Sequence, residues 1–115
     1  MSTAKTLNII NYFGSDVDAV VTNNNWNCCD SPTRGQQIGR IAANHMVSFT
    51  YQRTDGHGCN GRQGEFQLAF ESEYYTDMNF DGDGEIQIGA STNCSAFLFQ
   101  NGDGNYTMIV GHQVV

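Results

Sequence analysis

Short alternating segments separated by turn residues constrain this chain more than any other feature of its sequence. Apolar and polar residues alternate over Met46–Tyr51 and again over Glu65–Phe70. In a strand, the second segment places Phe66, Leu68 and Phe70 on one face. Turn signals rich in Gly, Asn and Asp recur roughly every ten residues, and no helical pattern persists. The pattern predicts about seven to nine short strands and argues against a helical bundle.

The expected strands follow from runs of β-branched and aromatic residues between turn signals. They lie at Leu7–Tyr12, Val17–Val21, Met46–Tyr51, Glu65–Phe70, Glu85–Ile88, Ser95–Phe99 and Tyr106–Gly111. Ile38–Ala43 fits a short helix or an edge strand, and we favour the strand. Thr22–Gly35 is polar and predicts an ordered loop, and Gln113–Val115 could extend the last strand.

The length of 115 residues suits one domain, so we expect residues 1–115 to form a single unit. One sheet of such strands cannot bury both faces, which favours two packed layers. The predicted fold is therefore an all-β, antiparallel β-sandwich of short strands.

The charge balance excludes some partners. Twelve acidic residues against five basic ones leave a net charge of −7, with one lysine and four scattered arginines. Nucleic acids and anionic membranes attract clustered Lys and Arg, so neither is an expected partner. Neutral sugars, zwitterionic lipid headgroups and cations remain open.

Targeting signals are also informative. No run approaches the ~18 apolar residues of a membrane-spanning helix, so no transmembrane segment is expected. The first residues lead straight into the Leu7 strand without a signal peptide, which predicts a cytoplasmic or non-classically secreted protein.

Four cysteines allow either disulfides or free thiols. They are Cys28, Cys29, Cys59 and Cys94. Adjacent cysteines rarely bond each other, so an oxidised chain would pair Cys28 and Cys29 outward with Cys59 and Cys94, in either of two connectivities. A zinc site is less favoured, because the chain lacks a Cys-x-x-Cys pair.

An acidic segment, Asp77–Glu85, resembles the opening of a calcium loop. Oxygen ligands alternate before a glycine, and a hard cation such as calcium would take them. The candidate ligands are Asp77, Asn79, Asp81, Asp83 and Glu85. However, Ile88 stands where a bidentate glutamate is required, so an Asp/Gly hairpin turn is the favoured interpretation. A similar Gly-Asp-Gly at 102–104 predicts a second turn of the same chemistry.

Aromatic and polar residues offer a candidate ligand site. Trp26 lies among asparagines, and Tyr74 precedes the acidic segment. An aromatic face can cover a sugar ring or a choline group, and nearby amides and carboxylates can satisfy its polar atoms. The candidate contacts are Trp26, Asn25, Tyr74, Asp81 and Asp83. Trp26 could equally plug one end of the core.

Several short motifs occur in an order similar to the aegerolysins. They are Leu7–Asn11, Gly14–Val17, Trp26, Gly61-Arg62 and Gly64–Leu68. Aegerolysins are small acidic β-sandwich proteins of fungi and bacteria without a classical signal peptide. The resemblance implies binding to membrane sphingolipids, in some cases with recruitment of a pore-forming partner, and it carries over Trp26 alone among the family's aromatic residues.

These observations together predict a non-enzymatic protein that recognises a membrane lipid headgroup or a cell-surface glycan, as a defence protein or cytolysin component. The alternative is a carbohydrate-specific lectin, cation-dependent or not, acting as a homo-oligomer because one shallow site binds weakly. A third hypothesis is a small guanyl-type ribonuclease that uses a Glu, an Arg and one of His45, His57 and His112.

Overall fold

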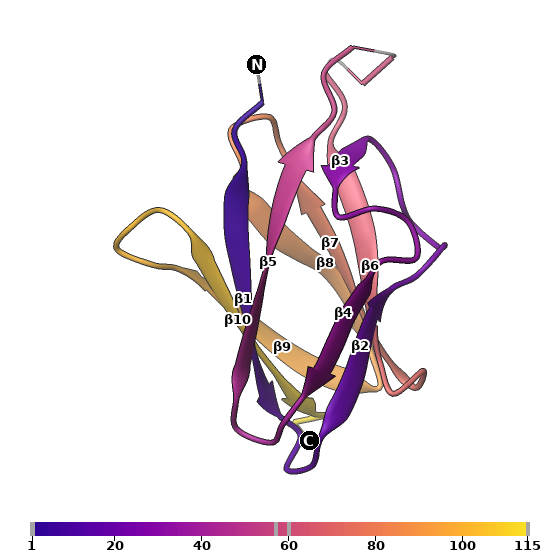
Figure 1. Cartoon of the computed structure of the whole chain (residues 1–115), viewed down its shortest axis with the longest axis vertical. Coiled ribbons are helices and arrows are strands. Elements are labelled where there is room, and N and C mark those ends of the chain that lie inside the picture. Colours follow the sequence, from indigo (N-terminus) through magenta and orange to yellow (C-terminus); the bar gives the residue numbers. More distant parts are fainter. Residues whose placement is uncertain (1, 57, 60, 115) are drawn as a thin grey trace.

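The computed structural model describes residues 2–56, 58–59 and 61–114, and all regular structure in them is β-strand (Figure 1). The ten strands are β1 (Lys5–Tyr12), β2 (Val17–Val21), β3 (Cys29–Ser31), β4 (Gln37–Ile41), β5 (Met46–Arg53), β6 (Gly64–Phe70), β7 (Tyr74–Phe80), β8 (Ile86–Thr92), β9 (Cys94–Gln100) and β10 (Tyr106–His112). In this part of the chain no helix is long and apolar enough to span a membrane.

Most expected strands are confirmed to within a few residues, including the edge strand β4, but two were missed. β3 lies inside the predicted loop Thr22–Gly35, and β7 occupies the first half of the predicted acidic loop. The polar residues Asp77 and Asn79 led the prediction to a loop. In the structure they alternate with the buried residues Thr76, Met78 and Phe80. That alternation is itself a strand pattern. The predicted extension at Gln113–Val115 also fails, because β10 ends at His112 and Val115 lies outside the described residues.

The strands form two five-stranded sheets. Sheet A has the order β3-β5-β1-β10-β9, and sheet B has the order β4-β2-β6-β7-β8. Among the described residues, all strand pairings are antiparallel except that of β1 with β10, which is parallel. The two ends of the chain therefore meet in the middle of sheet A, a pairing between segments about a hundred residues apart that no local pattern predicts.

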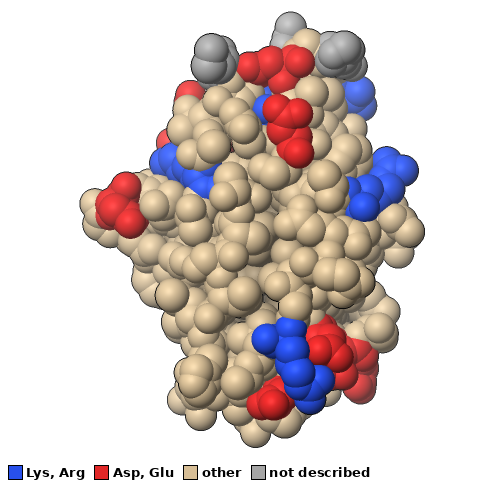
Figure 2. All heavy atoms as spheres, viewed as in Figure 1, with Lys and Arg blue, Asp and Glu red and all other residues tan. Residues whose placement is uncertain are grey.

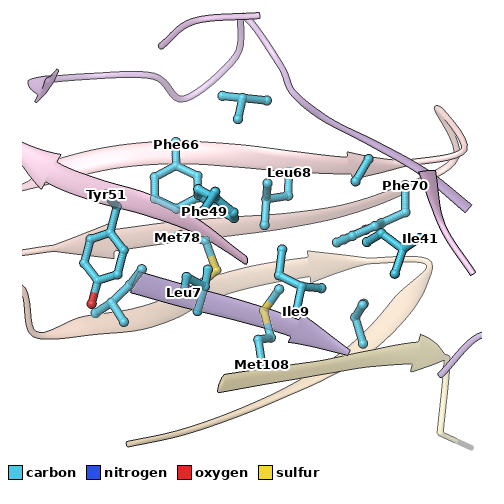
Figure 3. Close-up of a cluster of buried hydrophobic side chains, with 14 of the residues drawn as sticks. Leu7, Ile9, Ile41, Phe49, Tyr51, Phe66, Leu68, Phe70, Met78 and Met108 are labelled. Carbon is cyan, nitrogen blue, oxygen red and sulfur yellow. The ribbon is translucent and has the colours of Figure 1, made fainter. Parts of the chain in front are cut away.

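The inward side chains of both sheets share one hydrophobic core (Figure 3). Phe49 of sheet A packs edge-on against Phe66 of sheet B, with ring centroids 5.8 Å apart. Tyr51 packs in the same way against Phe80 at 4.9 Å, and its hydroxyl donates to the carbonyl of Gly84. Because the core takes the inward residues, each sheet keeps a separate outer face for contact with other molecules.

Two hairpin turns have the same backbone hydrogen bonds, as the repeated Gly-Asp-Gly predicts. The N–H of the first turn residue donates to the carbonyl four residues on, from Asp81 to Glu85 at 3.1 Å and from Asn101 to Asn105 at 2.7 Å. A glycine at positive φ completes each turn, where a β-carbon would be strained. Lys5, the one lysine of the chain, donates from Nζ to the carbonyl of Gly104, at 3.0 Å.

Candidate functional site

The cysteines form one disulfide, not the two that full oxidation would give. Cys28 pairs with Cys59, whereas Cys29 and Cys94 are buried thiols. Cys29 faces the core, and its thiol donates to the carbonyls of Asn27 and Glu65. Burial raises the pKa of Cys29 to about 12, so the thiolate that disulfide exchange requires is scarce. The structure therefore combines the two alternatives, because Cys28 pairs outward with Cys59 as in an oxidised chain, whereas Cys29 and Cys94 are free thiols.

Trp26 has a different environment from the open stacking face that the sequence suggested. Its indole Nε1–H donates to the carbonyl of Pro32 at 3.1 Å, and it packs partly against the core. The guanidinium of Arg34 lies over the ring, 4.8 Å from its centroid. The preceding Asn23, Asn24 and Asn25 are exposed, and a ligand that stacks on the indole would share the ring with Arg34.

The remaining aromatic candidate, Tyr74, lies at the far end of the molecule from Asp81 and Asp83. It begins β7, and the turn with the two aspartates follows the end of that strand, about 20 Å away at the usual rise per residue. The Tyr74 ring packs on Phe13 at 4.6 Å and on His112 at 5.7 Å. The five predicted contacts therefore do not form one site.

The candidate cation ligands engage neighbours on the protein. Asp77 and Asn79, on the outer face of β7, accept hydrogen bonds from the side-chain amides of Gln67 and Gln87, each at 2.8 Å. Asp81 Oδ1 accepts the backbone N–H groups of Asp83 and Glu85, each at 3.0 Å. In the described residues, no group of three or more His, Cys, Asp or Glu could hold a metal ion.

A large surface without charge lies on the outer side of sheet A, which sequence analysis did not identify. The outward positions of its four longest strands hold no charged side chain, and we call them the uncharged face. They are Thr6, Asn8, Ile10 and Tyr12 of β1; Met46, Ser48, Thr50 and Gln52 of β5; Ser95, Phe97 and Phe99 of β9; and Thr107, Ile109 and Gly111 of β10. The chain's net charge of −7 therefore lies elsewhere.

One register level of the uncharged face is apolar across all four strands. Met46 pairs with Ile10, Ile10 with Ile109, and Ile109 with Phe97, and we call these four residues the apolar row. The ends of the row are the most open, since Met46 is 57% and Phe97 61% exposed. Figure 2 shows charged side chains toward the ends and margins of the molecule, with none in the middle of that view.

An apolar hollow of about 310 Å³ lies beside the apolar row. It is lined by Tyr12, Ser95, Phe97, Ile109, Gly111, His112 and Val114. Gly111 lies between Tyr12 and Ser95, its partners in the strands on either side, and a β-carbon there would lie 2.9 Å from the backbone oxygen of Tyr12. Tyr12 is 68% exposed, so its ring forms an open wall of the hollow.

A second, polar hollow of about 280 Å³ lies at the opposite end, beside the β7–β8 turn. It is lined by Gln63, Asp81, Glu85, Ile86, Gln87 and Tyr106. This hollow combines one aromatic ring with amide and carboxylate groups, and it includes Asp81 from the predicted site. Such a set can accept hydrogen bonds from hydroxyl groups.

The sequence does carry a signal for the uncharged face. In a strand with one solvated face, apolar and polar residues alternate. Residues 96–99 read Ala-Phe-Leu-Phe and residues 108–110 read Met-Ile-Val, so both faces of these strands carry apolar side chains. A strand that is apolar on both sides has a second apolar surface. Strand pairing determines which residues share that surface, so the sequence alone could not predict the apolar row.

The histidines of the ribonuclease hypothesis have separate surroundings. His112 contacts aromatic rings, with Phe13 edge-on at 5.3 Å, and His45 Nδ1 lies 2.9 Å from the carbonyl of Ala43 in the β4–β5 turn. His57 lies outside the described residues. The structure therefore offers no specific observation in favour of this hypothesis.

Comparison with protein-family models found no match, and comparison with curated proteins found none either. The assignment of function therefore rests on the surface and on the sequence motifs described above.

Proposed function

We propose that this protein is a β-sandwich recognition protein, without enzymatic activity, that binds membrane lipids through the uncharged face. The observation that carries this proposal is the apolar row, which crosses four strands in a surface free of charge on a chain of net charge −7. Exposed aromatic and aliphatic side chains partition into the headgroup region of a bilayer. The resemblance to the aegerolysins indicates the same class of ligand.

The charge distribution favours zwitterionic and neutral lipids. An anionic membrane attracts Lys and Arg, which the uncharged face lacks, and it repels a protein of net charge −7. The polar side chains on the same face are also uncharged, and two of them, Ser48 and Asn8, already share a hydrogen bond of 2.6 Å, so the face gains mainly from apolar contact. Sphingolipids with zwitterionic or neutral headgroups fit these requirements.

Vesicle sedimentation tests the proposal with two matched variants. Tyr12→Lys places a charge on the uncharged face, whereas Tyr75→Lys makes the same change on the outer face of sheet B. We expect wild type to bind sphingomyelin and phosphatidylcholine vesicles, phosphatidylserine to weaken binding, and Tyr12→Lys to lose at least ~10-fold in affinity. Equal losses in both variants, or no binding to any of these vesicles, would contradict the proposal.

The polar hollow supports a second candidate, glycan binding, because Tyr106 lies there beside Gln63, Gln87 and two carboxylates. A glycan array with wild type and Gln87→Ala tests it, and a parallel array with chelator tests the calcium prediction. A sugar that binds wild type and is lost in Gln87→Ala supports a lectin. Sugar binding unchanged by that variant would remove the hollow from consideration.

A further inference from the structure

The two sheets have four edge strands, β3 and β9 in sheet A and β4 and β8 in sheet B, and three of them are protected against pairing with another chain. An unprotected edge exposes backbone N–H and C=O groups, and proteins block it with short strands, charges, prolines or bulges. β3 has three residues and precedes Pro32. β4 carries Arg40, which pairs with Asp16 and Asp18 on the side of β2, and the β2–β4 register is irregular. The pairing of β8 with β7 is irregular as well.

β9 has none of these protections. All its seven residues pair with β10 in unbroken register, so its other edge continues the sheet without a bulge. It contains no charge and no proline, and the whole stretch from Ile86 to Gln100 is uncharged. Phe97 and Phe99 on this strand are 61% and 49% exposed.

We propose that β9 is a homodimer edge, along which two copies of the chain pair antiparallel and join their sheets A. A second copy is the fitting occupant because the strand is complementary to itself in length and character. Each copy has a net charge of −7, so two copies repel each other wherever their acidic surfaces meet. The uncharged β9 margin lets the backbones approach without that cost.

The length of β9 specifies the register of the dimer. A two-fold axis that pairs all of Cys94–Gln100 must pass midway between the two copies of the middle residue, Phe97. Phe97 of one copy then lies opposite Phe97 of the other, and Phe99 lies opposite Ser95. Aromatic cross-strand pairs of this kind stabilise antiparallel strands.

The small contact area predicts a weak dimer. Two partly exposed phenylalanines per copy and one strand edge fall at or below the low end of stable interfaces, about 1,200 Å² in total. We therefore expect dissociation at micromolar concentrations and a dimer that is visible only when the protein is concentrated.

Sedimentation velocity without lipid tests the edge and its register together. Phe97→Lys places two lysines opposite each other, and Phe97→Glu does the same with carboxylates, so each variant alone should raise the dissociation constant at least ~10-fold. An equimolar mixture of the two should recover the dimer, because the charges then attract. Met46→Lys, at the other end of the apolar row, is the matched control and should dimerise as wild type does.

Several results would overturn the proposal. They are a wild-type chain that stays monomeric to millimolar concentration, a Phe97→Lys variant that dimerises normally, a mixture that fails to recover the dimer, or equal loss in Met46→Lys. Hydrogen exchange on wild type needs no variant: amide protection across β9 must rise with protein concentration. Protection that rises elsewhere instead would place the contact on another surface.

The dimer would also strengthen membrane binding, a consequence that rests on the proposed function. Pairing along β9 places two uncharged faces side by side in one continuous sheet, so both can meet one membrane. Two linked contacts bind more tightly than one. The sedimentation experiment contains no lipid, so the dimer can stand if lipid binding fails.

Discussion

The outer faces of the two sheets differ in chemistry although their inner faces share one core. On sheet B, outward side chains bond to one another: Thr22 donates to Gln67, and Gln67 donates to Asp77, both at 2.8 Å. On sheet A, a similar chain of hydrogen bonds runs from Ser48 to Asn8 and on to Thr107, but the apolar row on the same face has no polar group to pair and stays exposed at its ends. Polar side chains that already bond to one another, which we call a polar ladder, gain little from a ligand. Covering exposed apolar surface, in contrast, lowers the free energy. This contrast is why we place recognition on sheet A.

The largest expected effect separates inner from outer aromatic residues. Phe66, at the centre of the core, is fully buried between Phe49 and Phe80, and Phe66→Ala should lower the free energy of unfolding by about 3–5 kcal/mol. Phe99→Ala on the uncharged face should cost about 1 kcal/mol or less, because the ring is already half exposed. Urea denaturation of both variants measures the difference, and similar losses would mean that the Phe99 ring is part of the core.

A smaller effect tests whether the side chains of the polar ladder on sheet B find their hydrogen-bond partners within the chain. Gln67 bonds both Thr22 and Asp77, so Gln67→Ala should cost about 0.5–1.5 kcal/mol and leave vesicle binding unchanged. A double-mutant cycle with Asp77→Ala isolates the bond between the two side chains. Additive losses would show that this bond contributes nothing, and weaker vesicle binding would extend the recognition surface to sheet B.

The smallest effect concerns a charge at the end of sheet A. Asp55 accepts hydrogen bonds from Ser2 and from Arg53, and these bonds lower the pKa of Asp55 from 3.8 to about 2. A lowered carboxyl pKa stabilises the fold above pH 4, and this contribution is lost as the pH falls through about 2. Asp55→Asn should therefore be less stable than wild type at pH 6, and the gap should close between pH 4 and pH 2. Parallel stability curves over that range would rule out this role.

Much of the fold was predictable because inward alternation and turn chemistry are local. A few neighbouring residues are enough to predict the inward positions of Leu7, Ile9, Phe66 and Leu68. The same holds for the two Gly-Asp-Gly turns. The candidate site was harder to predict, because the sequence does not show which groups of the protein itself contact Trp26, Tyr74 and Asp81. In the structure, Arg34 lies over Trp26, Phe13 and His112 pack on Tyr74, and backbone amides bind Asp81.

The sequence by itself determined the all-β class, the positions of most strands, the residues that face inward and the overall negative charge. Only the tertiary structure decided that β1 pairs with β10, that Cys28 rather than Cys29 bonds Cys59, and that the apolar row exists. The physical reason is distance along the chain. Alternation reports which side of its own strand a residue occupies, whereas Met46, Ile10, Ile109 and Phe97 become neighbours only when four separate strands come into register.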